Sequence, residues 1–176
     1  VLSVVYHSGY GHTAKVAEAV AEGAKGTGIT VHVLKADALS DADWSTLDAS
    51  HAIIFGAPTY MGGVSAPFKT FIDASSKRWF MQTWKDKVAA GFTNSASYSG
   101  DKLASVQQLM ILAMQHGMIW VGQTEVAPQL GDGEIPTLEA INRVGSYSGL
   151  MTQSNAKSAP DVAPPTGDLE TARRFG

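Results

Sequence analysis

Residues 1–24, VLSVVYHSGYGHTAKVAEAVAEGA, contain the stretch that decides the fold. Residues 1–6 are rich in β-branched and apolar side chains, which is typical of a strand. Residues 8–13 form a glycine-rich segment. Beyond it, apolar residues recur at the spacing of one helix face, at Val16, Ala17, Val20 and Ala24. The sequence therefore predicts a strand, a tight loop and a helix, which glycines 26 and 28 can end.

Short apolar runs alternate with helical patterns along the rest of the chain, which is typical of a parallel α/β sheet. Further strands are expected at residues 31–34, 52–55, 88–92 and 118–121. The second of these runs, Ala-Ile-Ile-Phe, is apolar without alternation, as a strand covered on both faces requires. We therefore predict one α/β domain over residues 1–176. Its doubly wound, five-stranded parallel sheet has the order 2-1-3-4-5, with helices on both faces.

The sequence patterns of the remaining elements are less regular. One helix is expected to begin at Pro67, and another is marked by Leu103, Val106, Met110 and Ala113. The segment around Trp44 is expected to be a short connection. Residues 122–149 lose all periodicity, and so long an irregular stretch usually serves function or an interface. Residues 154–166, with three prolines, are expected to be loop, followed by a helix that the chain end truncates.

Composition excludes several classes of function. The net charge is −3, and the only dense basic sites are Lys77-Arg78 and Arg173-Arg174, which argues against nucleic acid as a partner. The absence of cysteine excludes disulfides, a catalytic thiol and iron–sulfur clusters. No histidine–carboxylate spacing resembles a metal site. No apolar run approaches the roughly 20 residues that span a bilayer. A cytoplasmic location is therefore expected by default.

The loop after the first strand has the features of a phosphate site. It reads Ser8-Gly9-Tyr10-Gly11-His12-Thr13 and stands directly before a helix. Its glycines let the backbone approach an anion closely, the helix N-terminus offers free N–H groups, and Ser8 and Thr13 add hydroxyls. The alternative, a tight turn that merely needs glycine, does not explain the clustered hydroxyls. A dinucleotide-binding loop fits poorly, because no acidic residue ends the second strand.

Two further loops follow the third and fourth strands. The first contains Pro58, Thr59, Tyr60, Met61 and Gly62, and its Tyr and Met side chains can lie against a flat ring. The other contains Asn94, Ser95, Ala96, Ser97, Tyr98 and Ser99, which offer donors for a polar ring edge. Either could be an ordinary turn. In the expected strand order, however, all three loops face one crevice. A ligand with a phosphate and a planar polar ring fits them, and FMN is such a ligand.

These motifs resemble those of a known family. The first loop, the Gly-Ala-Pro-Thr run at residues 56–59, Phe-Lys-Thr-Phe-Ile-Asp at 68–73 and His-Gly-Met at 116–118 are similar to the flavodoxin-like NAD(P)H:quinone oxidoreductases of the tryptophan repressor-binding type. The resemblance covers nearly the whole chain and implies a flavodoxin-like fold. It implies that FMN is held non-covalently, with its phosphate at residues 8–13 and its ring at the other two loops.

The resemblance also implies a substrate side. It suggests that Tyr10 meets the nicotinamide donor, that His116 lies near the flavin and that Trp79 lines the substrate side. It further implies a homo-oligomer, a tetramer or a dimer, whose active sites are shared between subunits. By position alone, His116 could equally cap a helix, and Trp79 could be an interface or core aromatic.

The function expected from these features is electron transfer. NADH or NADPH would reduce the flavin, leave, and be replaced by a quinone that takes two electrons in a ping-pong reaction. No obligatory catalytic acid or base is expected, because the cofactor itself accepts hydride. Two alternatives stay open: a carrier flavodoxin without reductase activity, and a protein-binding module without cofactor.

Overall fold

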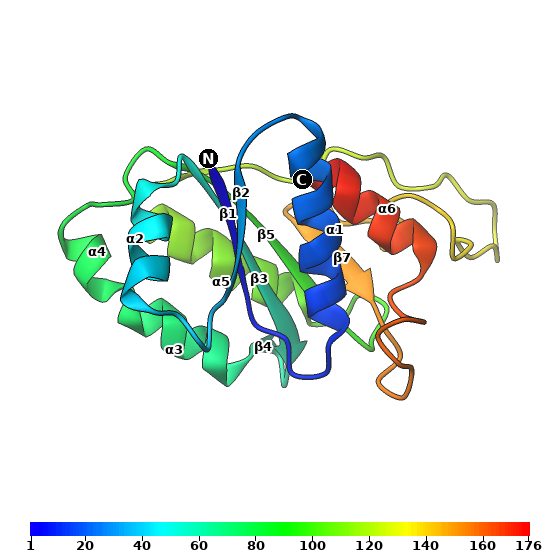
Figure 1. The fold of residues 1–176 in the computed structure, drawn as a ribbon. Helices are drawn as coiled ribbons and strands as arrows, with labels where there is room; N and C mark the ends of the chain where they lie inside the picture. The colour runs from blue at the N-terminus through cyan, green and yellow to red at the C-terminus, as the bar shows by residue number, and fades with distance from the viewer.

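The computed structural model describes residues 1–176 and contains a parallel sheet with helices on both faces (Figure 1). The main path of the sheet is β2-β1-β3-β5-β6, and every neighbouring pair along it is parallel. The strands are β1 (Leu2–Tyr6), β2 (Val31–Lys35), β3 (Ala52–Tyr60), β5 (Val88–Ser95) and β6 (Ile119–Trp120). The predicted α/β class, strand order and direction are confirmed.

Alternation along the central strands builds two cores. Val4 packs into one cluster of 14 buried residues and Val5 into another, because successive strand residues point to opposite faces. The first core lies under α1 (His12–Gly26) and α6 (Thr166–Phe175). The second lies under α2 (Asp41–Ala49), α3 (Ala66–Ala74) and α5 (Lys102–Gln115). The helix predicted after the glycine-rich loop is present as α1, and the helix expected at Pro67 is present as α3, which begins at Ala66.

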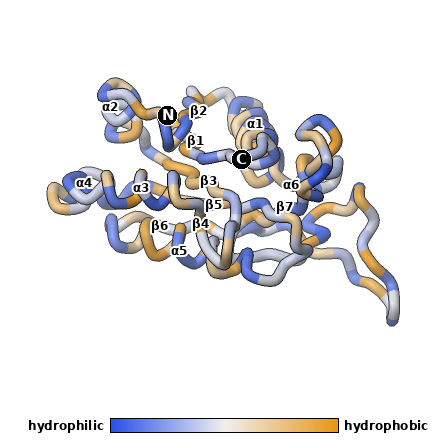
Figure 2. The backbone as a smooth tube through the Cα atoms, turned by 90° about the horizontal axis from the view of Figure 1, so that it is seen from below, coloured by the Kyte–Doolittle hydropathy of each residue, from blue (hydrophilic) through white to orange (hydrophobic).

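Two segments share the edge position next to β5. β6 pairs with β5 at Val88 and Ala89, whereas β7 (Leu150–Gln153) pairs with it further along, from Phe92 to Ser95. Residues 121–149 leave the sheet between them and extend from the body of the molecule (Figure 2). We call this segment the excursion. The predicted continuous strand at 118–121 is therefore too long, and β7 was not predicted.

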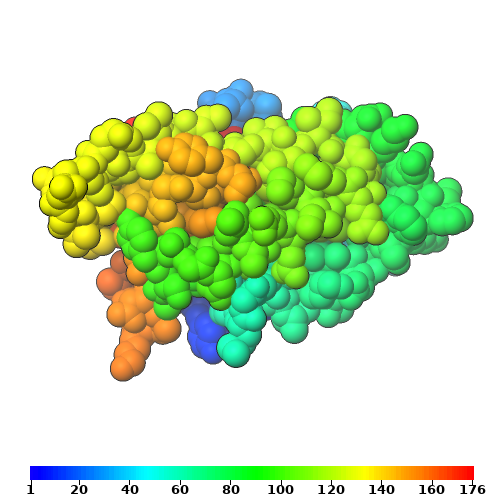
Figure 3. Space-filling view, turned by 180° about the vertical axis from the view of Figure 1, so that it is seen from behind, coloured from blue at the N-terminus to red at the C-terminus, as the bar shows by residue number.

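The excursion closes tightly at its base. The indole Nε1 of Trp120 donates to the Ser148 carbonyl at 2.8 Å, which joins its two ends. Gly149 lies so close to β5 that a Cβ there would approach the Gly91 oxygen to 2.7 Å. The excursion occupies one end of the back face of the molecule, beside the residues of β7 (Figure 3).

Three local predictions were wrong or incomplete. The segment around Trp44 is the helix α2, started by a capping box in which Ser40 and Asp43 each bond the other's backbone N–H. The short helix α4 (Ser76–Phe80) and the short strand β4 (Gly63–Val64), which pairs antiparallel with the end of β3, were not predicted. In α5, Leu103 is exposed and Met110 only half-buried, because the buried stripe is rotated to Lys102, Ser105, Val106, Leu109, Leu112 and Ala113. No helix has both the length and the apolar character that crossing a membrane would require.

Candidate functional site

A crevice of about 470 Å³ opens at the carboxyl ends of β1, β3 and β5. The structure brings all three predicted loops to it: the lining includes Tyr10, His12, Thr13, Pro58, Thr59, Tyr60, Met61, Asn94, Ser95, Ala96 and Ser97. Three lining residues were not predicted, namely Asp101, Ser154 and Ala156. No Lys or Arg lines the crevice, so any anion there must be bound by neutral donors.

The first loop holds unused donors at the start of α1. Ser8 Oγ accepts the amides of Gly11 and Ala14, both at 3.1 Å, and its own O–H donates to no group in the chain. The amides of Tyr10, His12 and Thr13 form no hydrogen bond within the chain, nor does the Thr13 hydroxyl. These donors gather at the positive end of a 15-residue helix. The arrangement fits a phosphate group.

Glycine is needed twice in this loop. Gly11 has a φ of 89°, and a Cβ there would also meet Pro160 at 2.6 Å. A Cβ on Gly9 would lie 2.8 Å from the Tyr60 hydroxyl, whose pKa is raised by burial. The His12 ring bonds the Ser158 carbonyl through Nε2 at 2.8 Å. His12 therefore offers its backbone to the site, while its ring tethers the 154–165 loop.

The second loop is a tight turn between β3 and β4. Met61 and Gly62 both have positive φ, of 48° and 85°, and the Met61 side chain is fully exposed. The Tyr60 ring meets the Tyr10 ring edge-on with centroids 6.1 Å apart, so two aromatic side chains border the crevice. Asp101 Oδ2 accepts the Gly62 amide at 3.1 Å, which ties this turn to the start of α5.

The third loop presents polar groups without partners. Asn94 Oδ1 accepts from the hydroxyls of Thr152 and Ser154, at 2.8 and 3.0 Å, and its Nδ2 donors have no partner in the chain. The Ser95 hydroxyl is buried and also lacks a hydrogen-bond partner. Buried polar groups are normally paired, so the unpaired Ser95 hydroxyl indicates a polar ligand in the crevice, and the Asn94 amide beside it is available to the same ligand. They fit the edge of a planar ring that carries carbonyls and ring nitrogens.

Several predicted FMN residues do not line the crevice itself. Ser8, Gly9, Gly11 and Gly62 support its walls, as described above. The Tyr98 side chain points away, because its hydroxyl donates to the Arg143 carbonyl and its ring lies 5.5 Å from the Arg143 guanidinium. Ser99 lines a separate surface depression beside the excursion.

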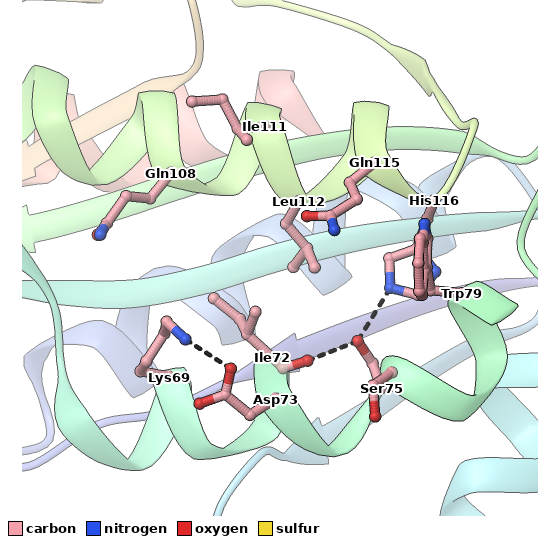
Figure 4. A pocket seen from close by; sticks show the side chains of 11 residues that line it. Lys69, Ile72, Asp73, Ser75, Trp79, Gln108, Ile111, Leu112, Gln115 and His116 are labelled. Atoms are coloured by element: carbon pink, nitrogen blue, oxygen red, sulfur yellow. Dashed lines mark hydrogen bonds and ion pairs between the residues drawn. The ribbon is translucent and has the colours of Figure 1, made fainter.

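His116 and Trp79 lie in a second cavity, of about 310 Å³, between α3, α4 and α5 (Figure 4). Within one chain neither residue lines the crevice. His116 ends α5, where its backbone N–H bonds the Leu112 carbonyl. Its ring packs on Trp84 with centroids 4.5 Å apart, and burial lowers its pKa to about 4. Trp79 is nearly half exposed.

The sequence contained a signal for one of the three residues that were missed. Asp101 follows a Ser-Gly pair directly before a helix, which is a position where a carboxylate can reach a neighbouring loop. Ser154 lies at the end of β7, so it could be found only after that strand was recognised. Ala156 belongs to the proline-containing loop, and nothing in its type marks it.

Comparison with known proteins decides the family. A family model described as NADPH-dependent FMN reductase matches residues 7–131, which include all three loops. The chain belongs to this family. Its members are flavodoxin-like oxidoreductases, and the resemblance stated from the motifs is confirmed.

Individual relatives of this FMN reductase family member cover almost the whole chain. Flavodoxin FldP of Pseudomonas aeruginosa is 45% identical over 98% of the chain and 90% of its own length. An NAD(P)H dehydrogenase (quinone) of Azorhizobium caulinodans is 32% identical over 98% of the chain and 92% of its own length. The crystal structure of a WrbA-like flavodoxin from Agrobacterium tumefaciens is 46% identical, with a TM-score of 0.75 over 99% of the chain and 90% of its own.

Proposed function

We propose that the protein binds one FMN non-covalently in the crevice and transfers two electrons from NADH or NADPH to a quinone in a ping-pong reaction. The observation that carries this proposal is the crevice itself, where unpaired amides, hydroxyls and an amide side chain from the first and third loops converge without a cation, beside the Tyr60 and Met61 side chains. Bound FMN supplies the ring that accepts hydride and passes electrons on.

The first loop is suited to the phosphate. The amides of Tyr10, His12 and Thr13, together with the Ser8 and Thr13 hydroxyls, are the donors that would hold it. Each hydrogen bond to a charged group contributes about 1.5–3 kcal/mol, so three or four suffice without Lys or Arg. Ser8 is well suited to bind the phosphate because its oxygen already accepts two amides, so its own proton stays available to donate to the ligand.

The other two loops are suited to the ring. Tyr60 and Met61 would lie against its face, and Asn94 to Ser97 would donate to its polar edge. Tyr10 is three-quarters exposed at the mouth of the crevice, where a nicotinamide donor would enter. Backbone donors aimed at the ring edge stabilise the negative charge that reduction places there. No side chain is needed as an acid or base.

A carrier flavodoxin is the second candidate, and the name of the 45% identical relative favours it. A carrier docks its redox partner through charge, and a net charge of −3 is mild for that purpose. Turnover separates the two candidates, because a carrier holds FMN but does not oxidise NAD(P)H with a quinone.

The test begins with apoprotein and ends with turnover. Apoprotein is titrated with FMN and, as the matched control for the phosphate, with riboflavin. We expect FMN to bind at least tenfold more tightly, and the variant Ser8→Ala to lose most of that preference. Steady-state oxidation of NADH and NADPH with benzoquinone should then give parallel double-reciprocal lines. Protein that binds FMN without turnover is a carrier, and protein that takes up no FMN refutes both candidates.

We also propose that the chain is a homo-oligomer in which the cavity that holds Trp79 and His116 in one subunit adjoins the crevice of another. Within one chain these residues lie in the second cavity, which the exposed apolar side chains of Trp79 and Ile111 also line. Further exposed apolar side chains occur on the same two helices, α4 and α5, or directly after them, at Phe80, Met81 and Met114. Light scattering should give a tetramer or a dimer. A monomer that turns over at full rate would contradict this arrangement.

A further inference from the structure

A fully buried lysine supports the third loop from behind. Lys102 is the first residue of α5, and none of its side chain is exposed. Its ammonium donates to the carbonyls of Ser97 and Tyr98, the latter at 3.3 Å. Burying an ammonium group is costly unless it is paired and hydrogen-bonded, so its position calls for a specific role.

The lysine belongs to a buried charged cluster that we define as Lys102, Arg143 and Asp168. Arg143 holds Asp168 through two hydrogen bonds, Nε–Oδ1 at 2.7 Å and Nη2–Oδ2 at 3.1 Å, and both side chains are almost fully buried. Asp168 also accepts the backbone amide of Gln153 at 2.7 Å. Two cations and one carboxylate give this cluster a formal charge of +1, which the Asp101 carboxylate, next to Lys102 in the chain and in the crevice wall, offsets in part.

The carbonyls that Lys102 holds determine where the loop's amides point. In a trans peptide the C=O and the following N–H point in opposite directions. With the carbonyls of Ser97 and Tyr98 turned inward to Lys102, the amides of Tyr98 and Ser99 face away from it. Neither amide forms a hydrogen bond within the chain. Ser97, on the same loop, lines the crevice.

We propose that Lys102 is a positioning residue for the flavin ring: it holds the third loop in the conformation that brings Ser97 to the crevice, and its positive charge favours the negative charge that reduction places on the ring edge. The inference rests on the proposed FMN function and deepens it. Lys102 has no exposed surface and acts through the loop, so it is not a catalytic group.

The charge state of Lys102 links this role to pH. Burial lowers its pKa to about 8; the Asp168 and Asp101 carboxylates oppose this shift, and the Arg143 guanidinium adds to it. As pH rises from 7 to 9.5 the ammonium loses its proton and with it the attraction for the two carbonyls. FMN affinity of the wild-type protein should therefore fall over this range.

The experiment compares Lys102→Met with Lys15→Met. The control removes one positive charge from an exposed lysine of α1 that pairs only with Glu18. FMN affinity is measured by flavin fluorescence from pH 7 to 9.5, and the midpoint potential at pH 7 by equilibration with a reference dye. For Lys102→Met we expect at least tenfold weaker binding with no fall above pH 7. We also expect a potential more negative by about 30 mV, which corresponds to a tenfold loss of preference for reduced FMN.

Each outcome decides a separate question. Lys102→Met with wild-type affinity, potential and pH profile overturns this inference and leaves the proposed FMN function intact. Wild-type apoprotein that binds no FMN overturns the proposed function itself. If the Met variant does not fold, the pH series on wild type and Lys15→Met decides, because a flat profile in both overturns the role of Lys102.

Discussion

The ring of His116 donates its Nε2 proton to Ser75 Oγ at 2.9 Å, because that hydroxyl donates its own proton to the Ile72 carbonyl at 2.7 Å (Figure 4). This direction fixes the neutral tautomer with an unprotonated Nδ1. Nδ1 is buried and has no partner in the chain. A second proton on the ring would therefore create a buried cation without an acceptor, which is the physical reason for its lowered pKa.

The first prediction concerns acid stability. The pKa of His116 is about 4 in the folded chain against 6.5 when exposed, so between these values the unfolded state binds the extra proton. The contribution of His116 to the free energy of unfolding is therefore fully present above pH 6.5. It is lost as pH drops toward 4, by about 3 kcal/mol in total. Urea unfolding at pH 7, 5.5 and 4 measures it.

Two variants isolate this contribution. His116→Gln keeps a donor for Ser75 but cannot titrate, so the loss between pH 7 and 4 should be smaller by about 2–3 kcal/mol. His32→Gln, on the edge strand β2, is the matched control and should keep the wild-type slope. Equal slopes for both variants would show that His116 does not govern acid stability.

The central half of the fold could be predicted from the sequence because its signals are local. The strand, loop and helix of residues 1–26 follow from hydrophobic spacing and glycine, and the uniformly apolar run at 52–55 marks a central strand. The three crevice loops followed from the strand order, because strands β1, β3 and β5 end at the same edge.

The edge of the sheet could not be predicted because its signals are not local. β6 has only two residues, and β7 is defined by pairing with β5 after an excursion of 29 residues. The buried stripe of α5 was misplaced because Lys102 and Ser105 occupy core positions, and polar types normally mark the exposed face. Tyr98 was assigned to the ring because nothing local predicts its bond to Arg143, 45 residues away.

The second prediction uses two glycines of α1. Gly23 faces the end of α6, and a Cβ there would lie 1.8 Å from the Arg173 carbonyl oxygen, whereas a Cβ on Gly26 meets nothing within 4 Å. Gly23→Ala should destabilise the fold by about 1–3 kcal/mol through overpacking. Gly26→Ala should be neutral or stabilise by up to about 1 kcal/mol through helix propensity. Thermal unfolding of both variants measures the difference, and Gly23→Ala at wild-type stability would contradict this packing of α6.

The third prediction tests the buried ion pair between the excursion and α6. Arg143→Met leaves Asp168 buried and unpaired, which should cost about 3–5 kcal/mol at pH 7. Arg174→Met removes an exposed arginine and is the control, which should leave the free energy of unfolding nearly unchanged. Adding Asp168→Leu to Arg143→Met should restore at least half of the loss, since no uncompensated charge remains. Additive losses in the double variant would mean that the two residues do not stabilise each other.

The fourth prediction concerns Asp101, which lines the crevice and accepts the Gly62 amide at 3.1 Å. Asp101→Asn keeps an acceptor for that amide but removes a negative charge beside the proposed flavin, so reduction should become easier. A charge effect of about 1 kcal/mol corresponds to a midpoint potential higher by about 20 mV.

Asp101→Ala also frees the turn at Met61 and Gly62, and should in addition weaken FMN binding about fivefold, a loss of about 1 kcal/mol. Asp132→Asn, in the exposed excursion, should change neither quantity. A lower potential in Asp101→Asn, the direction expected for Lys102→Met, would rule out an electrostatic role for this carboxylate at the ring.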